Sequence, residues 1–107
     1  MKTYKIVKSD IKDSERFTNS IESIVLSWSD KQKLMGKFTT GFGWYNNLRA
    51  LYSMKLVDLR LFKLIKITHD FFSNLYVGQT IPLDCWEKHV LLQRTVMNML
   101  SSNTRNS

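Results

Sequence analysis

The 107-residue sequence contains only one cysteine, one proline and four glycines. The single cysteine, Cys85, cannot form an internal disulfide, which excludes a disulfide-framed secreted domain and favours a reducing, cytoplasmic setting. The scarcity of proline and glycine leaves long uninterrupted stretches, which favours helices over a β domain with many turns. Apolar residues make up 43% of the chain and aromatic residues 12%, enough to supply the core of one domain.

Sequence motifs for catalysis are also missing. The chain has no G-x-x-x-x-G-K-[ST], G-x-G-x-x-G or G-x-S-x-G. Its most apolar region, residues 56–67, is interrupted by four charged residues, whereas a membrane-spanning helix needs about 20 mostly apolar residues. The basic segment 1–8 is followed by polar residues, so we expect no signal peptide. We therefore predict a protein that is not an enzyme and has no cofactor, metal site or small-molecule substrate.

Acidic side chains are in the minority: nine against 16 basic ones, for a net charge of +7. The imbalance is most one-sided in residues 38–77, which hold five cations and two anions. Such a surface favours a negatively charged partner, which would be nucleic acid, an anionic membrane or an acidic protein. A surplus that serves only solubility is the alternative. The composition, rich in lysine, asparagine and serine, suits a bacteriophage or other mobile element.

The apolar spacing predicts one all-α domain over residues 1–107, a compact bundle of about four helices with a long central third helix. The weak alternation of residues 1–8 fits a short strand or a flexible arm. Because no second strand is evident in the sequence, an arm over residues 1–12, or a segment that leads into the first helix, is favoured. Ser14 is a candidate cap for a first helix that ends near Trp28. Residues 102–107 lack an apolar anchor and are predicted to fray.

The later helices are predicted from caps and breaks. Residues 29–32 read as a capping box that starts a short helix to about Phe38, and the glycines of segment 41–43 break it. The third helix would run from Trp44 to about Val77, and because that is long for so small a domain, we expect either a kink near residues 53–55 or a helix that protrudes. Gly78 would stop it, and a last helix, with Thr80 and Pro82 at its start, would reach about Ser101.

The predicted third helix carries two apolar surfaces. Apolar residues at three- and four-residue spacing form one broad face: Ala50, Met54, Val57, Leu61, Leu64, Ile65, Thr68, Phe72 and Leu75. Cations gather on the opposite side: Arg49, Lys55, Arg60, Lys63 and Lys66. Three more apolar residues, Leu56, Leu59 and Ile67, lie among those cations. An ordinary surface helix exposes one polar face to water. Because this helix has apolar side chains on its basic face, we predict that either the rest of the domain or a partner covers that face.

The leading functional hypothesis is a protein-binding regulator, adaptor or inhibitor that docks an acidic protein. The predicted partner-binding residues are Leu56, Leu59, Arg60, Lys63, Lys66 and Ile67. Self-association as a homodimer through the same seam stays open, as does a central helix that is simply packed on both sides.

The alternative hypothesis is a nucleic-acid-binding regulator. A short helix, a glycine turn and a following helix invite a helix-turn-helix interpretation. Its candidate contacts are Trp44, Tyr45, Asn46, Asn47, Arg49 and Lys55. The turn at residues 39–43 is longer than that motif allows. We therefore favour packing of Trp44 in the core over a contact between Trp44 and a nucleic-acid base.

Two further pairs have the spacing of one helical turn. Cys85 and His89 resemble a nucleophile with its base, or half of a zinc site, but they fall on the predicted core face beside Trp86, and no other ligands fit. We interpret them as structural. Lys66 and Asp70 are predicted to form an ordinary surface ion pair.

Overall fold

The computed structural model describes residues 2–34 and 43–105, which form four helices and two short strands. In chain order they are β1 (Thr3–Lys5), α1 (Lys8–Leu34), α2 (Trp44–Ser53), α3 (Leu59–Ser73), β2 (Thr80–Pro82) and α4 (Leu83–Arg105). The predicted all-α class is confirmed, with a small sheet added. Among the described residues, no helix is both long enough and apolar enough to cross a membrane.

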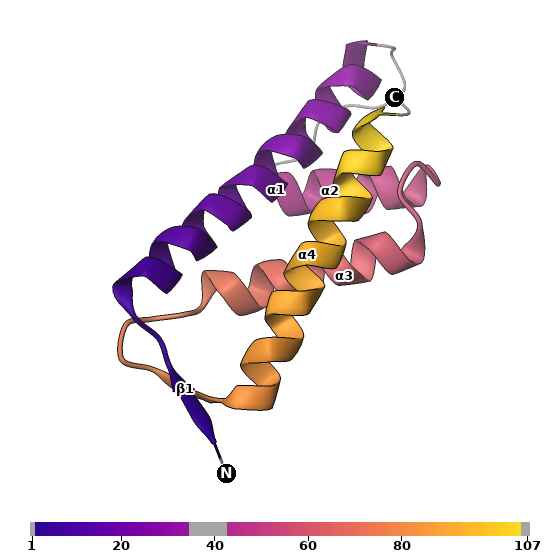
Figure 1. Cartoon of the computed structure of the whole chain (residues 1–107). Coiled ribbons are helices and arrows are strands. Elements are labelled where there is room, and N and C mark those ends of the chain that lie inside the picture. Colours follow the sequence, from indigo (N-terminus) through magenta and orange to yellow (C-terminus); the bar gives the residue numbers. More distant parts are fainter. Residues whose placement is uncertain (1, 35–42, 106–107) are drawn as a thin grey trace.

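The two long helices lie over the two shorter ones. α1 and α4 both run from the end of the molecule that carries β1 toward the opposite end, and α2 and α3 cross behind them (Figure 1). α1 packs against α2 and α3, and α4 packs against α3. The molecule is elongated, at 51 × 22 × 21 Å, because α1 alone is about 40 Å long. α3 contacts every other helix, so it is central as predicted.

The core lies where α3 meets the other helices. Its fully buried apolar side chains come from all four helices and from the α2–α3 connection: Phe17, Ile21, Val25, Leu48, Leu51, Val57, Leu61, Ile65, Phe72, Val96 and Leu100. Phe17 of α1 meets Phe72 of α3 edge to face, with ring centroids 5.4 Å apart. Most members recur every three or four residues along their helices, as the sequence pattern predicts.

α1 is one helix through residue 34, so the predicted break before Asp30 is wrong. The Ser29 hydroxyl is buried and donates to the Val25 carbonyl (3.0 Å), which satisfies it inside the helix instead of at a cap. Residues 35–42 of the predicted short helix and turn lie outside the described residues. At the start of α1, the Asp10 carboxylate accepts from the backbone N–H of Val7 (2.9 Å), so the cap lies at Val7, seven residues before the predicted cap at Ser14.

The predicted third helix is two helices. α2 ends at Ser53, Lys55 takes a left-handed conformation (φ 62°), and α3 starts at Leu59. Asp58 caps α3, because its side chain accepts from the Leu61 N–H at 2.7 Å. The change of direction therefore falls next to the predicted kink, but it is a full break. α3 also ends at Ser73, five residues before the predicted stop at Gly78.

Within the predicted arm, residues 3–5 form the strand β1 and residues 8–12 belong to α1. β1 pairs antiparallel with β2, in the register Thr3↔Pro82, Tyr4↔Ile81 and Lys5↔Thr80. Tyr4 also stacks on Trp86 of α4, with centroids 4.6 Å apart. Residues at 80–82 therefore belong to a strand and not to a cap, and α4 starts directly after them.

At the other end, α4 continues through Arg105, beyond the predicted end at Ser101, so most of the predicted frayed tail is helical. Residues 106 and 107 lie outside the described residues.

Candidate functional site

The buried side of α3 determines which of its residues face away from the core. Leu61, Ile65 and Phe72 are buried at three- to four-residue spacing, and the buried Thr68 hydroxyl donates to the Leu64 carbonyl at 2.7 Å. The buried Thr68 hydroxyl is thus satisfied within the helix. The opposite residues must then point away from the core.

All six predicted partner-binding residues are exposed. Leu59 is 46% exposed and Ile67 47%, and they lie two turns apart on α3 with Lys63 between them; Leu56, in the connection before α3, is 46% exposed. We call Leu56, Leu59, Arg60, Lys63, Lys66 and Ile67 the α3 outer face. The prediction left open whether the rest of the domain covers this face, and the structure leaves its apolar side chains nearly half accessible.

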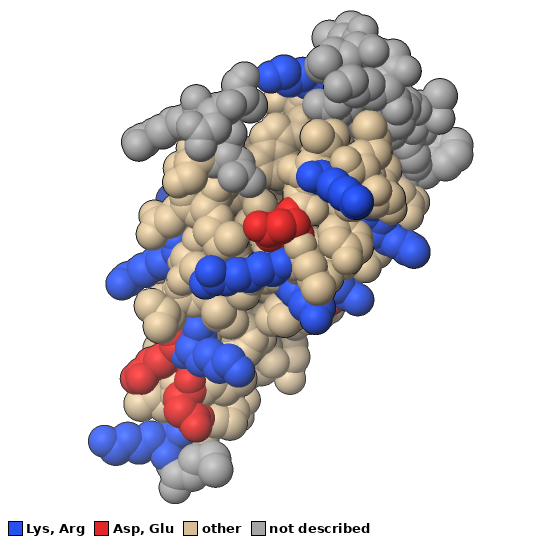
Figure 2. Space-filling model, turned by 90° about the vertical axis from the view of Figure 1, so that its right-hand side faces the viewer, with Lys and Arg blue, Asp and Glu red and all other residues tan. Residues whose placement is uncertain are grey.

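The α3 outer face is basic without internal compensation. In the described part of the chain, the ion pairs are Arg16–Asp13 (3.9 Å) and His69–Glu22 (3.8 Å), so the cations of this face have no carboxylate partner there. The predicted Lys66–Asp70 pair is not formed, and the Lys66 ammonium lies 5.8 Å from the centre of the Tyr45 ring. On the side of the molecule shown in Figure 2, basic side chains spread over much of the surface, whereas acidic ones are few.

An aromatic row on α2 supports one edge of this face. Tyr52 stacks on Phe62 of α3 (centroids 4.9 Å apart, planes at 26°), and Tyr45 lies 6.2 Å from the same ring. Tyr52 is itself exposed. The sequence analysis did not assign Tyr52 or Phe62 to the site. The feature that could have indicated the two tyrosines is their seven-residue spacing, which places Tyr45 and Tyr52 on one side of α2.

The residues of the nucleic-acid hypothesis do not share one surface. Asn47 is only 2% exposed, so its amide cannot reach a base edge. Trp44 is half-buried, packs against the core and lies 4.1 Å from the His69 ring, as its predicted core role requires. Asn46, Arg49 and Lys55 are exposed. Only the cations of this set therefore retain a surface suited to phosphate.

The His69 ring sits between three helices. Its Nε2 is buried without a hydrogen-bond partner, and the nearest carboxylate oxygen, from Glu22 of α1, is 3.8 Å away. The ring contacts Trp44 of α2. These contacts join α1, α2 and α3 below the N-terminus of α2, and they form no open site.

Cys85 and His89 are neighbours, but the histidine is committed elsewhere. The His89 Nδ1 lies 2.8 Å from the Cys85 carbonyl oxygen and 3.7 Å from the Cys85 sulfur. A carbonyl only accepts, so Nδ1 carries the proton and donates it, and cannot serve as a base toward the thiol. The ring also stacks on Phe71 (3.7 Å, 12°). In the described residues, no group of three or more histidine, cysteine, aspartate or glutamate side chains is arranged to hold a metal.

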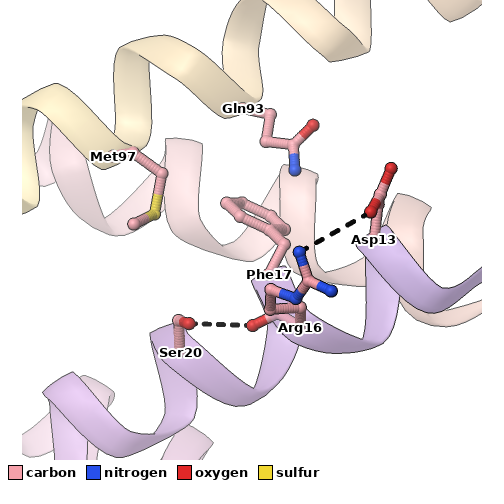
Figure 3. Close-up of a pocket in the computed structure, with 6 residues that line it drawn as sticks. All are labelled: Asp13, Arg16, Phe17, Ser20, Gln93 and Met97. Atoms are coloured by element: carbon pink, nitrogen blue, oxygen red, sulfur yellow. Dashed lines mark hydrogen bonds and ion pairs between the residues drawn. The ribbon is translucent and has the colours of Figure 1, made fainter. Parts of the chain in front are cut away.

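Hollows in the described surface lie along α4. One groove, of about 260 Å³, separates α1 from α4, and Figure 3 shows the residues that line it: Asp13, Arg16, Phe17, Ser20, Gln93 and Met97. Arg16 is paired with Asp13, and the Ser20 hydroxyl donates to the Arg16 carbonyl (2.8 Å). The polar groups at the rim thus bond largely to one another, and the floor is Phe17 and Met97.

No protein-family model, curated protein or solved structure matches this chain.

Proposed function

We propose that this chain is a non-catalytic protein that binds an acidic protein through the α3 outer face, as a regulator, adaptor or inhibitor. The observation that carries the proposal is the exposure of Leu59 and Ile67 on the side of α3 opposite the core. Arg60, Lys63 and Lys66 are exposed on the same helix beside these two residues. Apolar side chains grouped within a polar rim are typical of protein-binding surfaces.

The two kinds of side chain would act differently. Leu56, Leu59 and Ile67 would form the dry centre, where most of the binding free energy of an interface arises. The cations would steer an acidic partner and set the orientation of docking. A second copy of the chain is a poor occupant of this face, because a two-fold contact centred on it would bring the same cations together from both copies.

The decisive variant is Leu59→Asp. Leu59 is the first residue of α3, where an added carboxylate suits the helix N-terminus, so the fold is expected to tolerate the change. A charge in the dry centre should weaken partner binding by at least about 100-fold. The matched control is Leu91→Asp, which places the same charge at an exposed leucine of α4.

The measurement has two stages. Crosslinking of the wild-type protein in extract of its host identifies acidic partners, and calorimetry with each purified partner then gives the dissociation constants of the wild type and both variants. Loss of affinity in Leu59→Asp alone, with an unchanged circular dichroism spectrum, supports the proposal. Equal affinity of Leu59→Asp and wild type for every partner found would refute it.

Sequence-independent binding to nucleic acid is the second candidate. It is favoured by the exposure of all five cations of α2, α3 and their connection, none of which pairs with a carboxylate of the described residues. Replacing Lys63 and Lys66 together by alanine should then reduce the salt slope of DNA binding by about 2, and Leu59→Asp should have little effect. An unchanged slope excludes phosphate contacts by this face.

A further inference from the structure

A second unpartnered surface lies on α4. Glu87, Val90, Leu91 and Arg94 follow each other at i, i+3, i+4 and i+7, so they share one side of the helix, opposite Val96 and Leu100 in the core. Leu91 is 63% exposed. We call these four residues the α4 outer patch. It faces away from the core and is separate from the α3 outer face in sequence and element.

The surface beside Leu91 is hollowed. Trp86 and Val90, with Glu87, Leu91 and Arg94, line a hollow of about 280 Å³. A neighbouring hollow of about 490 Å³ continues along the helix past Val90 and Arg94 to Met97. The groove of Figure 3 lies beyond it, between Met97 and Phe17 of α1. The patch thus combines a protruding leucine with a recess that could receive an aliphatic side chain.

The charges of the patch have no ion-pair partner among the residues that the structure describes. Glu87 and Arg94 are exposed and stand two turns apart, about 10 Å along the helix, which is too far for an ion pair within α4. Across the described residues, neither takes part in an ion pair. Each therefore presents a free charge at one end of the Val90–Leu91 centre.

The α4 outer patch is complementary to the same patch of a second copy when the two helices run antiparallel. In an antiparallel contact of two α4 helices about a two-fold axis between Val90 and Leu91, Glu87 of each copy faces Arg94 of the other. Val90 of each copy meets Leu91 of the other at the centre. One two-fold operation forms both ion pairs and the dry centre together.

We propose that a second copy of this chain occupies the α4 outer patch, forming an antiparallel homodimer. Leu91 of each copy enters the hollow beside Trp86 and Val90 of the other, and Glu87 and Arg94 form two equivalent ion pairs at the edges. A uniformly acidic partner would leave Glu87 opposed by like charge, and so would an anionic membrane. The alternation of charge therefore selects a second copy over those occupants.

The test is the mass of the full-length protein by light scattering and sedimentation, over concentrations from about 1 to about 300 μM. Wild type is expected to move from monomer to dimer mass within this range. Leu91→Asp should remain monomeric throughout. Glu87→Arg and Arg94→Glu should each weaken the dimer by about tenfold or more, because each creates two like-charge pairs. The double variant Glu87→Arg/Arg94→Glu exchanges the charges, keeps the complementarity and should dimerise like wild type.

The double variant keeps the test decisive if a single variant folds poorly, since all four residues lie on the surface. Leu59→Asp is the control for the α3 outer face and should dimerise normally. Three outcomes would overturn the proposal: a wild-type monomer at every concentration, a dimer that survives Leu91→Asp, or a double variant no better than the single charge reversals. A dimer lost in Leu59→Asp and kept in Leu91→Asp would also overturn it, and would assign self-association to α3.

Discussion

The opposite surroundings of Leu59 and Leu61 can be tested on a single helix, because the two leucines are two residues apart in α3. Leu61 is 1% exposed and belongs to the core, whereas Leu59 is nearly half exposed. Leu61→Ala removes buried methyl groups and leaves a cavity, which costs about 3 kcal/mol of unfolding free energy. Leu59→Ala removes contacts at the surface and should cost about 0.5 kcal/mol or less. Because leucine and alanine are both good helix formers, propensity contributes little to the difference.

Urea unfolding followed by circular dichroism measures both changes. With a slope of about 1.5 kcal/mol per M, Leu61→Ala should lower the midpoint by about 2 M and Leu59→Ala by about 0.3 M. Leu26→Ala on α1, where the leucine is 40% exposed, provides a second exposed control. If the two α3 variants lower the midpoint equally, the outer side of α3 is covered in solution, and the argument for a binding surface fails.

Three further predictions concern the connections that hold the helices in place. Asp58→Ala removes the cap of α3 and should cost about 1 kcal/mol in thermal unfolding, whereas Asp58→Asn should retain most of it; equal losses would contradict capping. Lys55→Gly should stabilise the protein by about 0.5–1 kcal/mol, because glycine adopts the positive φ without strain; a loss of stability would contradict this. The hydrogen bond from Tyr4 to Asp10, with partial burial and the carboxylate charge, raises the pKa of the Tyr4 phenol above its ordinary value of about 10. The stabilisation by this hydrogen bond is therefore present below about pH 10 and is lost as the pH rises through the raised pKa of Tyr4. The stability difference between wild type and Tyr4→Phe in urea should shrink across that range, and a constant difference would refute this role.

The two sides of α3 were predictable because they depend on local periodicity. The three- and four-residue spacing of Leu61, Ile65 and Phe72 predicted burial, and the structure buries all three. The same spacing placed Leu59 and Ile67 among the cations, and both are exposed. Which side chains an α-helix brings together follows from its 3.6-residue repeat alone. The repeat therefore predicts which side chains lie on the outer side of α3, but it carries no information about what binds there.

The end of α2 was harder to locate, because the usual breakers are missing. No glycine or proline lies between residues 48 and 77. Lys55 takes the left-handed conformation that glycine would normally provide. Asp58, an N-cap residue type immediately before apolar residues, was the available signal for the new start. The helix start predicted at Ser29 was wrong for a different reason. Serine is a common cap, but its hydroxyl can also donate to a carbonyl inside a helix, as Ser29 does to Val25.

The β1–β2 pairing could not be predicted from local patterns. Each strand has three residues, and their partners are separated by most of the sequence. Stacking of Tyr4 on Trp86 and the hydrogen bonds of Ile6 with Gln79 and Gly78 secure the contact. These interactions depend on the tertiary arrangement, which brings the start of α1 and the start of α4 to one end of the molecule (Figure 1).

That pairing also determines when the fold can be completed during synthesis. Ile81 is translated roughly 4–15 s after its partner Tyr4 at ordinary rates of elongation. Until then, the first strand and the buried Ile6 have nothing to dock on, while α1, α2 and α3 can already begin to pack. The strand pair that joins the start of α1 to the start of α4 therefore forms only after the residues of α2 and α3 have been made.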